Sequence, residues 1–167
     1  MKTVSTINTS IKHIPALFNK IEFSENETII NFGCGRYPDM VNDKLKNTII
    51  SYDPQFDKKE NNKTNVVTDI VDLYKIVDSF NGERDVITLC ANVFNVLTDD
   101  LLDDVIIQLT ALHYIGCKIF ISVYEGDKSG VHKKTTKGFQ RNEKTNQYLY
   151  LLDFGIVSIK RNVISII

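Results

Sequence analysis

Short apolar runs alternate along the chain with segments whose apolar residues recur every three or four positions. The short runs, rich in β-branched and aromatic residues, predict strands: TIINF, TIISYD, NVVTD, the start of RDVITLCANVFNVL, KIFISVYE, IVSIK and VISII. Helical spacing predicts helices at residues 10–21, PDMVNDKL, VDLYKIVDSF, LLDDVIIQLTALHYI and NQYLYLLDF. Between KIFISVYE and about Asn142 the chain is polar, and we expect a loop there.

This alternation predicts an α/β fold in which a mostly parallel, seven-stranded sheet carries helices on both faces. Crossover connections between parallel strands place helices there. The last two strands flank a turn at Arg161 and Asn162, which predicts a C-terminal hairpin. A chain of 167 residues, 43% of them hydrophobic, can form one core, so we expect residues 1–167 to form a single domain.

The charges of the chain are nearly balanced, with 20 Lys and Arg residues and 21 Asp and Glu residues. The protein as a whole therefore has no strong electrostatic field of one sign. The apolar runs are far shorter than the roughly 20 residues that cross a bilayer, and the N-terminus lacks a continuous apolar segment. We therefore expect a cytoplasmic protein with no membrane partner. The cysteines and histidines lack the spacing of a metal site. Cys34 and Cys90 are candidate nucleophiles, but no histidine partner is indicated.

A glycine turn is the first candidate for chemistry. Gly33 and Gly35 follow the first strand directly, where a tight turn lets backbone amides approach a ligand. An ordinary turn that requires positive φ explains the same glycines. Asp53 ends the second strand about 20 residues later, a spacing at which a carboxylate accepts the ribose hydroxyls of an adenosine cofactor. Asp53 alternatively caps the turn that it forms with Pro54.

The absence of a third glycine in the motif indicates which kind of adenosine cofactor the chain would bind. Dinucleotide folds usually show a third glycine where this chain has Pro38, which favours an adenosine cofactor without pyrophosphate. Asp69 follows the third strand and is a candidate for the adenine amino group, with Ile70 as an apolar contact. A helix N-cap is an equally good explanation for Asp69.

Polar residues after the fourth strand and in the late loop are candidates for substrate contacts. Asn92 and Asn95 follow the strand at the edge where open α/β sheets bind ligands, although either can instead cap a helix or hold a loop. The segment 132–142 gathers four cations around one aromatic residue and includes Lys137, Gln140 and Arg141. It indicates a partner that carries phosphate, such as a nucleic acid, or else a solvated loop.

With these motifs the sequence resembles the class I S-adenosylmethionine-dependent methyltransferases, whose first strand closes in GxG. More narrowly, GCGRYPD, YDPQF, NVFNVL and KGFQRN look like small methyltransferases associated with DNA phosphorothioation loci and similar bacterial or phage-like proteins. The resemblance covers nearly the whole chain and implies a Rossmann-like methyltransferase fold.

The resemblance also implies residue roles. Gly33 and Gly35 would line the methionine and ribose, Asp53 would hold the ribose, Asp69 with Ile70 would meet the adenine, and Asn92 would face the methyl group. Asn31 stands where the family often has an acidic residue. The Pro-Pro-aromatic motif of DNA amino-methyltransferases is replaced by Ala91-Asn92-Val93-Phe94, so DNA amino methylation is not expected.

The expected function is methyl transfer from S-adenosylmethionine to an acceptor that the sequence leaves open, either a nucleic acid or a phosphate-bearing small molecule. In-line transfer needs mainly positioning, so the lack of an acid-base constellation does not count against it. Two alternatives stay open: a lyase or hydrolase that consumes the same cofactor, and a non-catalytic module that binds it.

Overall fold

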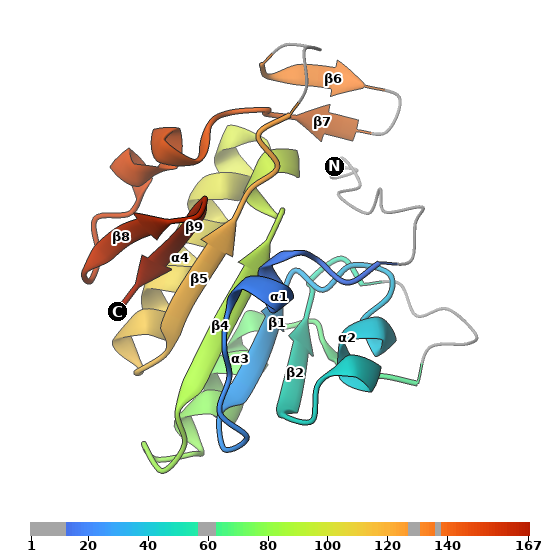
Figure 1. The fold of residues 1–167 in the computed structure, drawn as a ribbon, viewed down its shortest axis with the longest axis vertical. Coiled ribbons are helices and arrows are strands. Elements are labelled where there is room, and N and C mark those ends of the chain that lie inside the picture. The colour runs from blue at the N-terminus through green and yellow to red at the C-terminus, as the bar shows by residue number, and fades with distance from the viewer. Residues whose placement is uncertain (1–12, 57–62, 127–130, 136–137) are drawn as a thin grey trace.

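A computed structural model describes residues 13–56, 63–126, 131–135 and 138–167, and Figure 1 shows them as a sheet between helices. The seven-stranded sheet has the order β3-β2-β1-β4-β5-β9-β8. Its strands are β1 (Thr28–Phe32), β2 (Thr48–Tyr52), β3 (Val66–Val67), β4 (Val86–Ala91), β5 (Lys118–Ser122), β8 (Val157–Lys160) and β9 (Val163–Ile166). Strands β1 to β5 pair in parallel, whereas β9 pairs antiparallel to both β5 and β8. The predicted α/β class and mostly parallel sheet are confirmed.

Helices cover both faces of the sheet (Figure 1). They are α1 (Leu17–Lys20), α2 (Asp39–Lys44), α3 (Ile70–Asp78), α4 (Asp99–Tyr114) and two 3-10 helices, η1 (Phe94–Val96) and η2 (Thr145–Leu151). Neighbouring residues of β1 face opposite sides, because side chains alternate along a strand. Ile30 packs with α3 and α4, and Ile29 packs with α1 and α2. Among the described residues, no helix is both long and apolar enough to cross a membrane.

The C-terminal hairpin is confirmed at the predicted turn. Strands β8 and β9 join through Arg161 and Asn162, whose φ values are 53° and 59°. Two successive residues with positive φ form a turn whose twist matches the twist of paired strands. The hairpin extends the parallel sheet beyond β5 and ends it with antiparallel pairing.

The polar segment predicted as a loop contains a second, separate sheet. Strands β6 (Lys133–Thr135) and β7 (Gly138–Gln140) pair antiparallel and stand beyond the end of the main sheet in Figure 1. The prediction was wrong here because neither strand has an apolar face. Strand β7 packs against η1, which lies more than 40 residues earlier in the sequence, and a local pattern does not show such a contact.

The first predicted helix is also corrected. Of the predicted range 10–21, residues 10–12 lie outside the described part, and helix α1 begins only at Leu17. Pro15 explains the late start, because proline disfavours helical geometry at the preceding residue and cannot donate a backbone hydrogen bond. The apolar spacing persists through the segment, and both Leu17 and Phe18 are buried.

Candidate functional site

The glycine turn lies at the carboxyl end of β1 and adopts the backbone conformation that its glycines allow. Gly33 and Gly35 have φ values of +69° and +65°. The backbone N–H groups of Gly33 and Cys34 both donate to the carbonyl of Tyr52, at 2.8 and 3.0 Å. A Cβ on Gly33 would lie 2.4 Å from Cγ2 of Val93. The turn therefore requires glycine at position 33 both for its φ and for the close approach of the segment after β4.

Asp53 holds the turn from the neighbouring strand. Its Oδ2 accepts the N–H of Gly35 at 3.0 Å, and its Oδ1 accepts the N–H of Gln55 at 2.9 Å. The second bond closes the turn at Pro54, so the predicted capping role is present. An ionised carboxylate has about four acceptor positions, and roughly two remain for a ligand. Burial raises the pKa of Asp53 above its usual value, and the two backbone bonds partly offset that effect.

A cavity of about 490 Å³ lies where these segments meet, within the usual range for small-molecule sites. Among its lining residues are Gly33, Gly35, Asp53, Asn92 and Gln140, all predicted from sequence as site residues. The turn follows β1, Asp53 follows β2 and Asn92 follows β4, and these strands are adjacent in the sheet. Polar groups from the carboxyl ends of three parallel strands therefore converge on one cavity.

Asn92 enters the cavity from a left-handed backbone position. Its φ is 60°, and its N–H donates to the carbonyl of Ser122 at 2.8 Å, at the end of β5. The residue is exposed, in contrast to the preceding residues of β4. Asparagine adopts positive φ more readily than most residues, which explains why it can turn the chain here and still present an amide to a ligand.

Asp69 and Ile70 are not brought to the cavity. Oδ1 of Asp69 accepts the N–H of Val71 at 2.7 Å, which makes Asp69 the N-cap of α3. Ile70 packs against the larger core cluster. Neither residue is among those that line the cavity. The contact that Asp69 makes is the helix cap that the sequence offered as the alternative.

Asn95 is a buried connection between distant segments. Its Oδ1 accepts the N–H of Asn142 at 2.9 Å, and its Nδ2 donates to Oε1 of Gln140 at 2.8 Å. Its carbonyl accepts the N–H of Arg141 at 2.8 Å. With 2% of its surface exposed, Asn95 holds η1 to the strand β7 rather than facing a substrate directly. Gln140, in contrast, does line the cavity.

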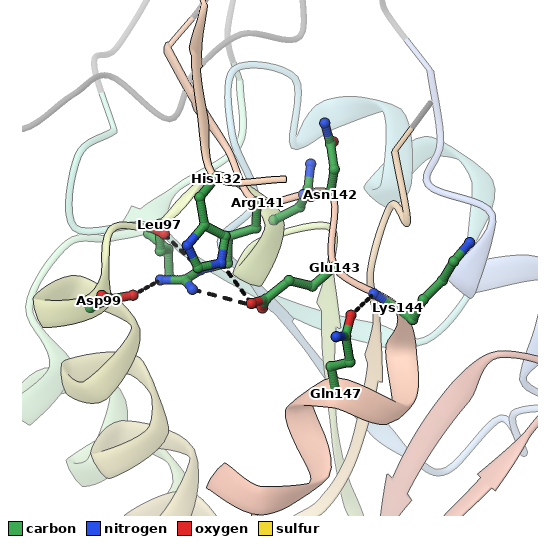
Figure 2. A network of polar contacts seen from close by, with 9 residues as sticks. Leu97, Asp99, His132, Arg141, Asn142, Glu143, Lys144 and Gln147 are labelled. Atoms are coloured by element: carbon green, nitrogen blue, oxygen red, sulfur yellow. Dashed lines mark hydrogen bonds and ion pairs between the residues drawn. The ribbon is translucent and has the colours of Figure 1, made fainter. Parts of the chain in front are cut away.

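Arg141 is held inside a network that Figure 2 shows from close by. Its Nε donates to the carbonyl of Leu97 at 2.9 Å, and one terminal nitrogen donates to Asp99 at 2.6 Å. Glu143 lies 3.8 Å from its other terminal nitrogen and also contacts His132 at 2.6 Å. The hydrogen bond and charge of Arg141 lower the pKa of Asp99.

This burial corrects the expectation that Arg141 meets a phosphate. Only 2% of Arg141 is exposed, and the guanidinium already has protein partners. Lys137 lies outside the described residues. Lys133 and Lys134 are exposed on β6, so they are the cations of segment 132–142 that the structure presents to solvent. Sequence could not separate these two environments, because lysine and arginine are both usually surface cations.

One wall of the cavity was missed by the sequence analysis. Helix α4 contributes Leu101, Asp104, Val105 and Gln108, and Tyr52 at the end of β2 donates its hydroxyl to Oε1 of Gln108 at 3.1 Å. The helical period of α4 is visible in the sequence, but it does not show that part of its inner face borders a cavity instead of the core.

The cysteines do not form a nucleophilic site. Cys34 lines the cavity, but burial and the nearby Asp53 raise the pKa of its thiol. Burial also raises the pKa of Cys90, which is fully buried in β4. Both thiols are therefore protonated near neutral pH, and the thiolate is the reactive form. Within the described residues, no group of three or more His, Cys, Asp or Glu side chains could hold a metal ion.

The fold and this cavity define an α/β protein with a cavity of small-molecule size at the carboxyl edge of its sheet. No protein-family model matches the chain, and no curated protein matches it significantly. Its function is therefore inferred from the chemistry of the site.

Proposed function

We propose that this chain binds S-adenosylmethionine in the cavity and transfers its methyl group to an acceptor. The observation that carries the proposal is the meeting of the glycine turn, Asp53 and Asn92 around one cavity of suitable volume. The remaining acceptor positions of Asp53 suit the two ribose hydroxyls. The sheet, parallel through β5 and closed by an antiparallel hairpin, also agrees with the Rossmann-like methyltransferase fold that the resemblance implies.

The segment after the turn favours this cofactor over a dinucleotide. A pyrophosphate is usually bound by free N–H groups at a helix N-terminus. Here the N-cap of α2 is Pro38, which has no N–H, and the first helical residue is Asp39. The carboxylate of Asp39 accepts the N–H groups of Lys63 and Thr64. A proline at the N-cap and a carboxylate at the first helical position make this helix N-terminus a poorer pyrophosphate site than the usual one, and a sulfonium cofactor does not need it.

The proposed chemistry is an in-line displacement. A lone pair of the acceptor forms the new bond to the methyl carbon, while the carbon–sulfur bond breaks and its electrons stay on sulfur. The products are the methylated acceptor and S-adenosylhomocysteine, and the acceptor releases its proton to solvent. Such a step depends on alignment of the reactants. In this proposal Asp53 holds the ribose and Asn92 faces the methyl group.

Calorimetry with S-adenosylmethionine, S-adenosylhomocysteine and NAD tests the cofactor. We expect both sulfur compounds to bind more tightly than NAD. Stronger binding of NAD, or no binding of either sulfur compound, would contradict the proposal.

Mass spectrometry of the products formed from S-adenosylmethionine separates the enzyme classes. S-adenosylhomocysteine with a methylated acceptor supports transfer, cleavage without an acceptor supports a lyase or hydrolase, and binding without turnover supports a non-catalytic module.

A further inference from the structure

The strand order places Gln140 at the end of the cavity away from the ribose site. Across the carboxyl edge of the sheet, Asp53 follows β2, the glycine turn follows β1 and Asn92 follows β4. Gln140 ends β7, which packs on η1 just beyond Asn92. With adjacent strands about 4.8 Å apart, roughly 10 Å separates the ends of β2 and β4. A cofactor whose ribose is held by Asp53 would therefore extend its reactive end along this edge toward Gln140.

The orientation of the Gln140 amide is determined by a chain of hydrogen bonds. The N–H of Asn142 can only donate, so the side-chain atom of Asn95 that receives it must be the oxygen. The other amide atom of Asn95 is then the nitrogen, which donates to Gln140. Oε1 of Gln140 must accept this bond, which leaves its Nε2 as the polar atom for the cavity. Among the described residues, Nε2 of Gln140 has no protein acceptor.

We propose that Nε2 of Gln140 selects the methyl acceptor by donating a hydrogen bond to a neutral carbonyl oxygen beside the nucleophile. This inference rests on the proposed function, since it assigns the second substrate of that site. The donor is held in place, because Asn95 accepts the N–H of Arg141 as well as binding Gln140. Two carboxylates, those of Asp53 and Asp104, and one cation, Arg36, line the same cavity, and the excess of negative charge disfavours a substrate carboxylate.

A single substitution is expected to turn the Gln140 amide so that an acceptor faces the cavity in place of the donor. In Asn95→Asp, one carboxylate oxygen still accepts the N–H of Asn142, but the other can no longer donate to Gln140. The Gln140 amide then rotates so that Nε2 donates to the new carboxylate and Oε1 faces the cavity. Hydrogen exchange of the Gln140 side-chain amide, followed by NMR, should slow in this variant because a carboxylate accepts its proton. Unchanged exchange would contradict the predicted rotation.

Three probes of similar shape test the preference in solution. Acetophenone presents a neutral carbonyl, benzoate a carboxylate, and aniline, which is uncharged near neutral pH, presents N–H donors. We expect acetophenone to bind the wild-type cavity about 2- to 10-fold more tightly than aniline, as one hydrogen bond allows. Asn95→Asp should reverse this order. Tighter binding of benzoate than of acetophenone would overturn the neutral-carbonyl assignment, and equal binding of all three probes would overturn the donor role.

Two further variants control the comparison. Thr98→Asp adds the same charge nearby at the N-cap of α4 and leaves the Asn95 to Gln140 contact intact, so it should keep the wild-type order of probes. Gln140→Glu keeps the oxygen that accepts from Asn95 and replaces the donor by an acceptor. It should lose the acetophenone preference even if Asn95→Asp fails to fold. A reversed order in Thr98→Asp would show that charge alone explains the result.

Titrations with and without S-adenosylhomocysteine separate this inference from the proposed function. If S-adenosylhomocysteine binds but the probe order does not depend on Gln140, the inference fails and the cofactor assignment stands. If S-adenosylhomocysteine does not bind but the probe order follows Gln140, the cofactor assignment fails and the donor role stands.

Discussion

Asp53 combines two roles in one carboxylate. It closes its own turn through Gln55 and holds the glycine turn through Gly35, while it also lines the cavity. Asparagine could keep the bond from Gln55, but its amide nitrogen would then face the N–H of Gly35, donor against donor. The structural role and the proposed ligand-binding role can therefore be separated only by comparing stability with affinity.

Asp53→Ala should weaken binding of S-adenosylmethionine by roughly 10- to 100-fold, because each hydrogen bond to a charged group contributes about 1.5–3 kcal/mol. Asp69→Ala is the matched control. It removes the cap of α3, which contributes about 1 kcal/mol to stability, but leaves the cavity lining intact. We expect its affinity to stay within about twofold of wild type. Calorimetry measures the affinity of each variant, and thermal unfolding measures its stability. If Asp69→Ala lost as much affinity as Asp53→Ala, the adenine contact that the family resemblance implies for Asp69 would be supported.

Gly33 allows a similar comparison with Gly82. Both have positive φ, at +69° and +72°, so alanine at either position should lower the free energy of unfolding by about 1 kcal/mol. Only Gly33 lies against Val93, whereas a Cβ on Gly82 meets nothing within 4 Å. Gly33→Ala should therefore lower stability further and also weaken cofactor binding. If calorimetry finds wild-type affinity in Gly33→Ala, the turn does not contact the ligand.

The β6–β7 hairpin has little apolar surface and is held by polar contacts. Arg141 follows β7 directly and joins the hairpin to Leu97 and to Asp99 at the start of α4 (Figure 2). A buried side chain that makes several charge-assisted bonds stabilises the segment that it connects. The position of Gln140 in the cavity therefore depends on a residue that is itself buried and does not line the cavity.

Arg141→Met should lower the free energy of unfolding by about 1–3 kcal/mol, since it leaves the buried carbonyl of Leu97 without its donor, whereas the exposed carboxylate of Asp99 is solvated by water. Amide hydrogen exchange in β7 should rise more than exchange in β1. Lys144→Met tests the neighbouring exposed cation, whose ion pair with Glu125 lies in solvent, and should change little. Similar protection of β7 in the wild type and in Arg141→Met would mean that strand pairing alone holds the hairpin.

The whole molecule should show a pH-dependent response to its ligand. Bonds from partner groups lower the pKa values of Asp99 and Glu125, so their contribution to stability is lost as pH falls through those depressed values. Asp53 contributes to stability in the opposite direction. Burial raises its pKa, so above that pKa the ionised carboxylate lowers the stability of the unliganded protein. In the proposed function, the ionised form is nevertheless the one that accepts both ribose hydroxyls.

The increase in thermal midpoint produced by S-adenosylhomocysteine should therefore be largest at neutral pH and decrease as pH falls through the raised pKa of Asp53. Taking the difference between liganded and unliganded midpoints removes the contributions of the other carboxylates. Asp53→Asn should show a smaller increase that does not vary over the same pH range. A wild-type increase that is constant with pH would exclude the Asp53 carboxylate from ligand binding.

Local patterns in the sequence determined the strands of the main sheet and the centre of the site. The run TIINF formed β1 as predicted, because every residue of this central strand is buried. Gly33, Gly35, Asp53 and Asn92 were placed at the ends of strands, and parallel strands bring their carboxyl ends to one edge. Their convergence therefore followed from the order of elements, although the adenosine ligand itself remains a proposal.

Only the tertiary structure decided which of the other polar residues reach the cavity. Asn95 and Arg141 are buried by partners more than 40 residues away, so no local pattern distinguishes them from exposed residues. Asp69 caps a helix, and the inner face of α4 became a cavity wall. The spacing of apolar residues shows which face of a helix or strand is covered. The packing of distant segments determines whether that face borders the core or a cavity, and whether a polar residue there forms a buried hydrogen bond.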